Sequence, residues 1–108
     1  MSYYVTETGV VGHTSTIAAG GELDMCAAPA LSDALTRAIA SVKHVVVDLS
    51  DATFMDSTAI GTLLAAMGKM HESGGRLHVI CANRNVLRTF EIAGLDRHVA
   101  AMTPELTL

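Results

Sequence analysis

Lysine and arginine are scarce in this chain, and the few that occur are scattered. Of the 108 residues, 7 are Lys or Arg and 11 are Asp or Glu, so the formal net charge is −4 at pH 7 with neutral histidines. No stretch gathers the basic residues into the stripe that recognition of a phosphate backbone requires. We therefore expect no direct binding of nucleic acid, and we expect any macromolecular partner to be a protein with basic residues in its contact patch.

Long apolar runs are also missing. The longest ones fall well short of the roughly 20 residues that a membrane-spanning helix needs, so we expect no transmembrane helix and no membrane partner. The first residues, "MSYYVTETGVVGHTS", lack a basic region followed by an apolar stretch. The pattern thus predicts no signal peptide, which favours the cytoplasm.

Cysteine and histidine occur in numbers and at spacings that do not suggest a metal site. The chain has 2 cysteines and 5 histidines, and no His pairs with a Cys, Asp or Glu at a spacing typical of metal ligands. Cys26 and Cys81 are expected to be a reduced loop thiol and a reduced buried strand thiol. We expect a folded monomer or weak dimer that needs no metal and no cofactor.

The hydrophobic residues, half of the chain, follow the periods of strands and helices. Strands are predicted at 3–8, 13–23, 44–49, 76–82 and 98–102, with a turn at 9–12 after the first. The runs "HVVVDL" and "RLHVICA" are continuously apolar inside, which predicts burial on both faces. One helix has Pro29 in its first turn and an apolar face from Leu31 to Val42, with no side-chain cap at Ala27 or Ala28. Helices are also predicted at 57–72 and at 83–95, the latter capped by Asn83 and stopped at Gly94. Alternating strands and helices indicate an α/β fold with a mixed, mostly parallel sheet packed with helices.

The helix at 57–72 has two faces with different predicted tasks. Asp56 or Ser57 is expected to cap its start. The side predicted to pack on the sheet carries Ile60, Leu63, Leu64, Met67, Met70 and His71. The opposite side carries the smaller or polar residues Thr58, Thr62, Ala65 and Lys69, which would let a partner approach closely.

A serine stands where the third strand region gives way to this helix, in "FMDSTAIG". Ser57 and Thr58 follow Asp56 directly, so a nucleophile is one interpretation. The chain has no G-x-S-x-G elbow, which argues against a serine-dependent enzyme. A histidine brought close by folding would be needed to restore that alternative. The chain also has no glycine-rich phosphate cradle that would argue for a nucleotide enzyme.

Three separated stretches, "GELD", "VVVDLSDATFMDSTAIGTLL" and "GGRLHVICANRNVLRTFEIAGL", occur in an order that resembles a STAS domain. More narrowly, they resemble the bacterial anti-sigma factor antagonists, and "DSTAIG" is the most specific part. The resemblance covers nearly the whole chain. It implies a single STAS-like domain at 3–102 with a short tail at 103–108.

The resemblance also implies a function. Ser57 matches the serine that an anti-sigma factor, itself a serine kinase, phosphorylates in this family. The unmodified antagonist binds the anti-sigma factor and frees the sigma factor, the phosphorylated form lets go, and a metal-dependent serine phosphatase resets it. The expected partner contacts are Asp24, Asp56, Ser57, Thr58, Thr62, Ala65 and Lys69.

This chain departs from the family at one point and leaves other uses open. Many relatives have Ser-Ser-Gly after the aspartate, whereas here the sequence is Ser57-Thr58-Ala59. Thr58 is therefore a second candidate acceptor, and Ala59 makes the turn stiffer than glycine would. The alternatives within STAS domains are a non-switching scaffold and a partner of a membrane transport complex.

Overall fold

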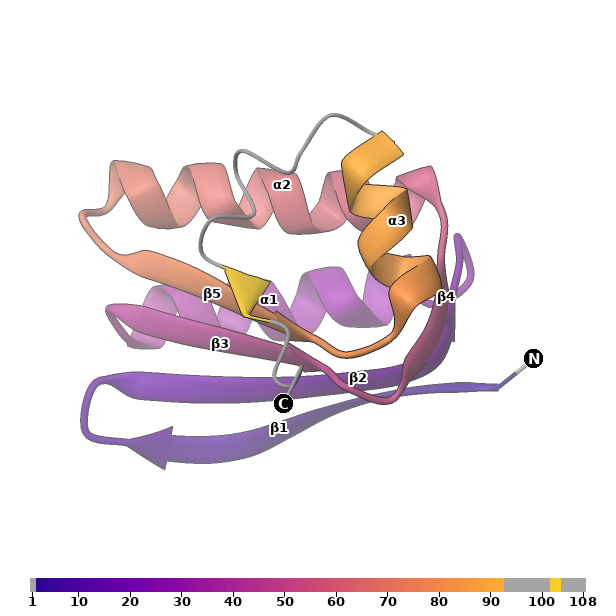
Figure 1. Cartoon of the computed structure of the whole chain (residues 1–108). Coiled ribbons are helices and arrows are strands. Elements are labelled where there is room, and N and C mark those ends of the chain that lie inside the picture. Colours follow the sequence, from indigo (N-terminus) through magenta and orange to yellow (C-terminus); the bar gives the residue numbers. More distant parts are fainter. Residues whose placement is uncertain (1, 93–101, 104–108) are drawn as a thin grey trace.

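The structure, a computed structural model, describes residues 2–92 and 102–103 of the chain. Strands and helices alternate along the described part, as predicted (Figure 1). In chain order the elements are β1 (Tyr3–Val11), β2 (Thr14–Leu23), α1 (Ala28–Ser41), β3 (His44–Leu49), β4 (Ala52–Met55), α2 (Ser57–Glu72), β5 (Arg76–Cys81), α3 (Arg84–Ile92) and β6 (Met102–Thr103).

All the described strands belong to one 6-stranded sheet. Its order is β1-β2-β3-β5-β6, and β4 pairs with β2 beside the end of β3. The β1–β2 pair is antiparallel, and the other described pairs are parallel. The mixed, mostly parallel α/β sheet that the sequence predicts is therefore confirmed.

The helices bury one face of this sheet. α1 packs against β1, β2 and β3, and α2 packs against β4, β5 and α1 (Figure 1). Along β3 the side chains alternate, so that Val45, Val47 and Leu49 are fully buried while Val46 and Asp48 are half-exposed. β5 has the same alternation. Burial of these strands on both faces is thus a wrong prediction, because a continuous apolar run does not reveal whether a second layer covers the sheet.

The first hairpin turns later than the sequence pattern predicts. Residues Gly9, Val10 and Val11, predicted as part of a turn, continue β1, and the turn lies at Gly12 and His13. The strand pairing shifts by one residue between Glu7 and Val10. Gly9, with φ of 100°, lies in this β-bulge, and Gly12, with φ of 63°, lies in the turn. One of the two glycines that suggest a turn therefore serves the bulge.

The short strand β4 is an element that the sequence analysis did not predict. It has four residues, of which Ala52 and Met55 are buried while Thr53 and Phe54 are exposed, so it lacks the alternation of a longer strand. Leu23 of β2 pairs with Met55 in the parallel register. β4 thereby carries the chain from the end of β3 to the start of α2, beside the end of β2.

The predicted third helix is confirmed over Arg84–Ile92. Its predicted cap is also confirmed, because Asn83 Oδ1 accepts the N–H groups of Asn85 at 2.8 Å and Val86 at 3.2 Å. The predicted stop at Gly94 lies outside the described residues. Of the predicted strand at 98–102, the structure describes Met102 alone, and it lies in β6. No helix in the described ranges combines the length and apolarity needed to cross a membrane.

Candidate docking and modification site around Ser57

Asp56 fixes the start of α2. Its backbone is extended, with φ of −101° and ψ of −179°, and its Oδ1 accepts the N–H of Ala59 at 3.0 Å. Its own N–H donates to the carbonyl of Leu23 at 3.2 Å, and its carbonyl accepts the N–H of Ile60 at 3.1 Å. Of the two residues predicted as caps, Asp56 is therefore the one that caps α2, and it also ties the helix to the end of β2.

Ser57 is the first residue of α2, and its side chain is exposed. Because Asp56 supplies the cap, the Ser57 hydroxyl is not engaged in it, and within residues 2–92 and 102–103 it makes no hydrogen bond. The adjacent Thr58 is also exposed, and its carbonyl accepts the Thr62 hydroxyl at 3.0 Å. The N–H groups of the first turn give this end of the helix a partial positive charge. An external enzyme can thus reach the Ser57 hydroxyl without breaking an internal contact.

The pairing of β2 with β4 brings Asp24 to the same end of the molecule. Asp24 follows Leu23 and Asp56 follows Met55, and Leu23 and Met55 are register partners. In addition, α1, α2 and α3 each begin shortly after a strand of the parallel part of the sheet. Their N-termini therefore lie at the carboxyl edge of the sheet, which is where open α/β sheets usually bind ligands.

Asp24 also shapes the turn that leads into α1. Its Oδ1 accepts the N–H groups of Cys26 at 2.9 Å and Ala27 at 3.3 Å. Its carbonyl accepts the N–H groups of Ala27 at 3.0 Å and Ala28 at 3.1 Å. No side chain at the cap position Ala27 caps α1, as predicted, but Asp24 holds the turn just before it.

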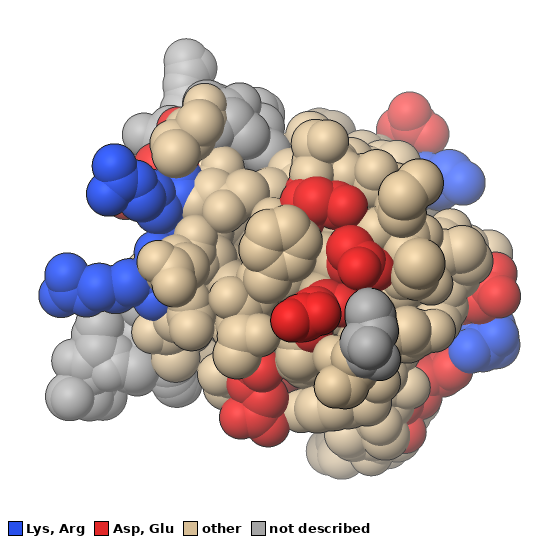
Figure 2. Space-filling model, turned by 90° about the vertical axis from the view of Figure 1, so that its right-hand side faces the viewer, with Lys and Arg blue, Asp and Glu red and all other residues tan. Residues whose placement is uncertain are grey.

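Carboxylates dominate this end of the molecule. Figure 2 shows acidic side chains gathered in its middle, with Lys and Arg at the margins. The paired strands β2 and β4 and their flanking residues contribute Glu22, Asp24, Asp51 and Asp56. The one ion pair found among the described residues joins Arg37 to Glu7, away from this group. The surface around Ser57 is therefore negatively charged and suits a partner with basic residues.

Tyr4 extends this end toward β1. Its hydroxyl donates to Asp51 Oδ2 at 2.8 Å. This hydrogen bond, with smaller contributions from burial and from the charges of Asp51 and Asp48, raises the pKa of Tyr4. The contact joins β1 to the turn that precedes β4, two elements that the sequence pattern did not connect.

Two large apolar side chains lie exposed beside the carboxylates, and the sequence analysis missed both as site residues. Met25, which follows Asp24, is 68% exposed, and Phe54, two residues before Asp56, is 48% exposed. Apolar side chains surrounded by polar ones are typical anchors of protein interfaces. The sequence holds no signal for this role, since the same residue types in a strand or turn more often enter the core.

The other predicted contacts lie farther along α2, on its side toward α1. Thr62, Ala65 and Lys69 line a crevice of about 40 Å³ together with residues of α1 that include Ser32 and Thr36. Thr62 is half-buried, and the other two are exposed. Lys69 is twelve residues from Ser57, which is about 18 Å along a helix. The structure thus brings Asp24, Asp56, Ser57 and Thr58 together and places the remaining three along the α1–α2 border.

The surroundings of Ser57 favour docking over catalysis. The four histidines in the described ranges are His13, in the turn between β1 and β2, His44, at the start of β3, His71, near the end of α2, and His78, in the first half of β5. None of them is near the start of α2. The larger of the described cavities lies along the C-terminal half of α2. Within the described part of the chain no histidine is therefore placed to act as a general base for Ser57.

The two cysteines are free and differ in their surroundings, which gives a testable prediction. Cys26 is exposed in the turn before α1, whereas Cys81 is buried at the end of β5, and burial raises the pKa of its thiol. A thiol reagent added to the native protein at neutral pH should label Cys26 first and Cys81 at least about tenfold more slowly. Peptide mapping after timed labelling measures both rates. Equal rates, or a Cys26–Cys81 disulfide in freshly purified protein, would contradict this assignment.

The mixed sheet, the strand-to-helix junction at Asp56 and the exposed serine after it define a STAS-type domain. Residues 6–107 match the family described as the STAS domain. The chain is also 30% identical over 77 residues to the anti-sigma-B factor antagonist of Staphylococcus aureus (strain NCTC 8325 / PS 47), covering 70% of this chain and 71% of that protein. This protein therefore belongs to the STAS domain family and, within it, to the anti-sigma factor antagonists.

Solved structures agree with this assignment. The crystal structure of an anti-sigma factor antagonist from Mycobacterium paratuberculosis superposes with a TM-score of 0.84 at 28% identity, over 98% of this chain and 89% of that one. The anti-sigma factor antagonist SpoIIAA in its unphosphorylated form superposes with a TM-score of 0.79 at 24% identity, over 93% of this chain and 86% of that one. The predicted STAS-like fold is thereby confirmed.

Proposed function

We propose that this protein binds an anti-sigma factor that is a serine kinase, so that a sigma factor is released, and that phosphorylation of Ser57 ends this binding. The observation that carries the proposal is the exposed Ser57 at the start of α2, directly after the cap Asp56. SpoIIAA, which shares the fold, has been solved in a phosphorylated form. The relatives named as antagonists of an anti-sigma factor supply the class of partner.

The start of α2 suits a phosphoryl acceptor. The hydroxyl is exposed and is not used for capping, so transfer to it breaks no cap. The added group carries a charge of about −1.5 to −2 at pH 7. Free N–H groups and the helix dipole tolerate an anion at this position. The modified protein should therefore keep its fold, and the signal should be read at the surface.

The unmodified surface offers two kinds of contact. Met25 and Phe54 supply exposed apolar area, and Asp24 and Asp56 supply negative charge around it. The fitting partner surface is an apolar depression with a basic rim. Along the α1–α2 border, Thr62 and Ala65 are small enough for close approach, and Lys69 offers a single positive charge.

A phosphoryl group on Ser57 opposes this contact in two ways. It holds water tightly, so the apolar side chains beside it cannot approach the partner as closely. It also meets like charge, from Asp24 and Asp56 and from the phosphates of the nucleotide that the kinase used. Among the described residues, Lys and Arg lie at the margins of this end of the molecule (Figure 2). Within the described part of the chain, no cation beside Ser57 therefore compensates the new charge.

Removal of the phosphate completes the cycle, and we assign it to a metal-dependent serine phosphatase. The exposed position of Ser57 that admits a kinase also admits a phosphatase. A cytoplasmic location, a monomeric or weakly dimeric state, and domain bounds of 3–102 with a tail at 103–108 remain predictions.

The first test maps the acceptor. The purified chain is incubated with its cognate anti-sigma kinase and Mg-ATP, and the modified residue is identified by mass spectrometry. We expect stoichiometric phosphate on Ser57, none on Ser57→Ala, and largely unchanged incorporation on Thr58→Ala. Thr58→Ala is the matched control, because Thr58 is the neighbouring exposed hydroxyl. Phosphate on Thr58 or elsewhere would sink the assignment of Ser57.

A further inference from the structure

Two adjacent glycines near the end of β2 let the start of β1 lie directly on this strand. Tyr4 is the register partner of Gly20, and Tyr3 is that of Gly21. A Cβ atom on Gly20 would lie 2.7 Å from Cζ of Tyr4 and 2.8 Å from its hydroxyl oxygen, which is closer than packed atoms approach. The Tyr4 ring therefore occupies the space that a side chain at this position would fill, and Gly20 is the seat of the ring.

The seated ring directs its hydroxyl to the turn between β3 and β4. The hydroxyl donates to Asp51 Oδ2 at 2.8 Å, and the Asp51 carbonyl accepts the N–H of Gly21 at 3.0 Å. From the β3 side, Asp48 Oδ1 accepts the N–H of Ser50 at 2.9 Å. The hydrogen bond to Asp51 raises the pKa of Tyr4, so the hydroxyl keeps its proton and remains a donor at neutral pH. Contacts from β1, β2 and β3 thus fix this turn, with Tyr4 contributing from β1.

The turn matters for the docking site because β4 follows it without a linker. Asp51 is the residue before β4, Phe54 lies in β4, and Asp56 follows β4 as the cap of α2. β4 has only four residues, and its pairing with β2 shifts register between Gly21 and Glu22. An irregular ladder of this length holds a strand loosely, so the contact at Asp51 helps to decide where Phe54 is presented.

We propose that Tyr4 is a positioning residue of the docking surface: its hydroxyl holds Asp51, and the fixed turn keeps β4 where Phe54 meets the anti-sigma kinase. This inference rests on the proposed function, in which that kinase docks beside Ser57. Tyr4 acts through Asp51 and need not touch the kinase. Without the hydroxyl, the ring still covers Gly20 and the fold remains, but the turn and β4 gain freedom that the kinase must remove on binding. The affinity falls by that cost.

The first test is Tyr4→Phe in the full chain, with phosphorylation of Ser57 by the cognate kinase and Mg-ATP measured at varied concentrations of the chain. We expect the KM for the chain to rise about three- to tenfold and kcat to stay within about twofold, because a lost hydrogen bond weakens binding while the acceptor is unchanged. Tyr3→Phe is the matched control, since Tyr3 is 39% exposed against 42% for Tyr4 and its hydroxyl makes no hydrogen bond to another described residue. It should behave as the parent chain does.

A double substitution separates positioning from direct contact. Because Tyr4 acts through Asp51, the effect of Tyr4→Phe should disappear in a chain that already carries Asp51→Ala, where the hydrogen bond is absent in any case. Asp51→Ala also removes a charge from the surface, so the single variant is the reference for the double variant. An effect of Tyr4→Phe that persists at full size on this background would mean that the hydroxyl contacts the kinase itself, and it would overturn the positioning role.

Two measurements on the free protein complete the test. Circular dichroism checks that each variant is folded, and amide hydrogen exchange at residues 51–55 should be at least about threefold faster in Tyr4→Phe than in the parent, with α1 unchanged. Equal exchange rates would contradict a freer turn. A folded Tyr4→Phe chain with the KM of a parent that is modified at Ser57 would refute the role of Tyr4 alone. A parent chain that the kinase neither binds nor modifies would refute the proposed function, and this role with it.

Discussion

Phosphorylation of Ser57 should lower the affinity of this protein for its anti-sigma kinase by about a hundredfold, or roughly 3 kcal/mol. The phosphoryl group adds about −1.5 to −2 charges at a surface that already carries Asp24 and Asp56. It keeps its water shell, and it separates Met25 and Phe54 from the partner. Titration of the kinase with phosphorylated and unmodified protein, at one fixed ionic strength, measures the two dissociation constants.

Two substitutions at Ser57 divide this effect into its causes. Ser57→Ala should bind as tightly as the unmodified protein and should no longer respond to ATP, because it loses the acceptor without adding charge. Ser57→Asp should bind about tenfold more weakly, since it adds one negative charge and less bulk than a phosphate. Higher salt should recover part of the loss in Ser57→Asp. A phosphate on Ser57 that left the affinity unchanged would remove the switch and leave a STAS-type binding module.

The stability of these variants is the necessary control, and the structure gives a reason to expect that it is unchanged. The Ser57 hydroxyl is not the cap of α2, because Asp56 Oδ1 accepts the N–H of Ala59. Ser57→Ala should therefore change the free energy of unfolding by no more than about 0.5 kcal/mol, as other exposed substitutions do. A weaker complex in Ser57→Asp then reports on the contact surface and not on a partly unfolded helix.

The sequence predicts the start of α2 well, and it predicts poorly which residues the fold gathers around that start. Asp56 and Ser57 are recognisable because a capping residue before a helical period marks a helix start. The closeness of Asp24 depends on the pairing of Leu23 with Met55, which involves residues far apart in the chain. Met25 and Phe54 are apolar and local pattern gives them no special place, so their exposure is known only once the fold is.

β4 shows the same limit for the fold. Ala52–Met55 is a four-residue strand with its two ends buried and its middle exposed. It has neither strict alternation nor a continuous apolar run, so neither strand pattern applies to it. Its pairing with β2 is what makes it a strand, and such long-range contacts override weak local preference. The longer strands β3 and β5 and the helices were predictable because their periods extend over six or more residues.

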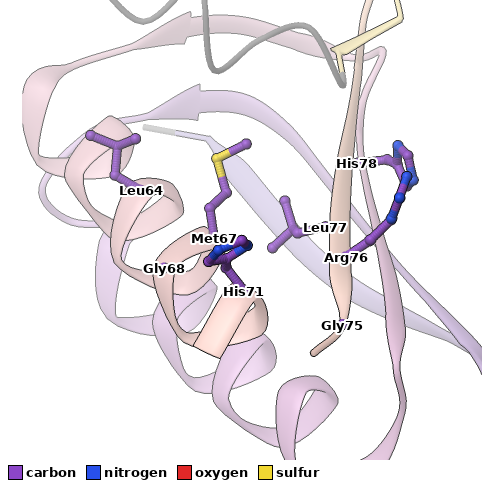
Figure 3. Close-up of a pocket in the computed structure, with 8 residues that line it drawn as sticks. All are labelled: Leu64, Met67, Gly68, His71, Gly75, Arg76, Leu77 and His78. Atoms are coloured by element: carbon purple, nitrogen blue, oxygen red, sulfur yellow. The ribbon is translucent and has the colours of Figure 1, made fainter. Parts of the chain in front are cut away.

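The orientation of α2 is the clearest case in which the pattern misleads. The large apolar residues predict a buried face that includes Leu64, Met67 and His71. The structure buries Ile60, Leu63 and Met70 as predicted, but it also buries Ala59 and Ala66. Met67 is half-buried, and Leu64 and His71 are exposed. The reason is that α2 packs against α1 as well as against the sheet. Small residues such as Ala66 fit where two helices approach closely. The buried face of α2 is therefore turned toward α1, and the larger Leu64 lies at the rim of the cavity between α2 and β5 (Figure 3).

Two adjacent leucines test this orientation with the same substitution. Leu63 has 0% exposure and Leu64 has 36%. Leu63→Ala should lower the free energy of unfolding by about 2–5 kcal/mol, because it removes buried methyl groups and leaves a cavity in the core. Leu64→Ala should cost at most about 1 kcal/mol, since a good part of its side chain already contacts water and alanine favours the helix. Urea unfolding followed by circular dichroism compares both variants with the parent chain. Equal losses would mean that Leu64 faces the sheet, as the pattern of large apolar residues predicts. They would also contradict the position of the cavity between α2 and β5.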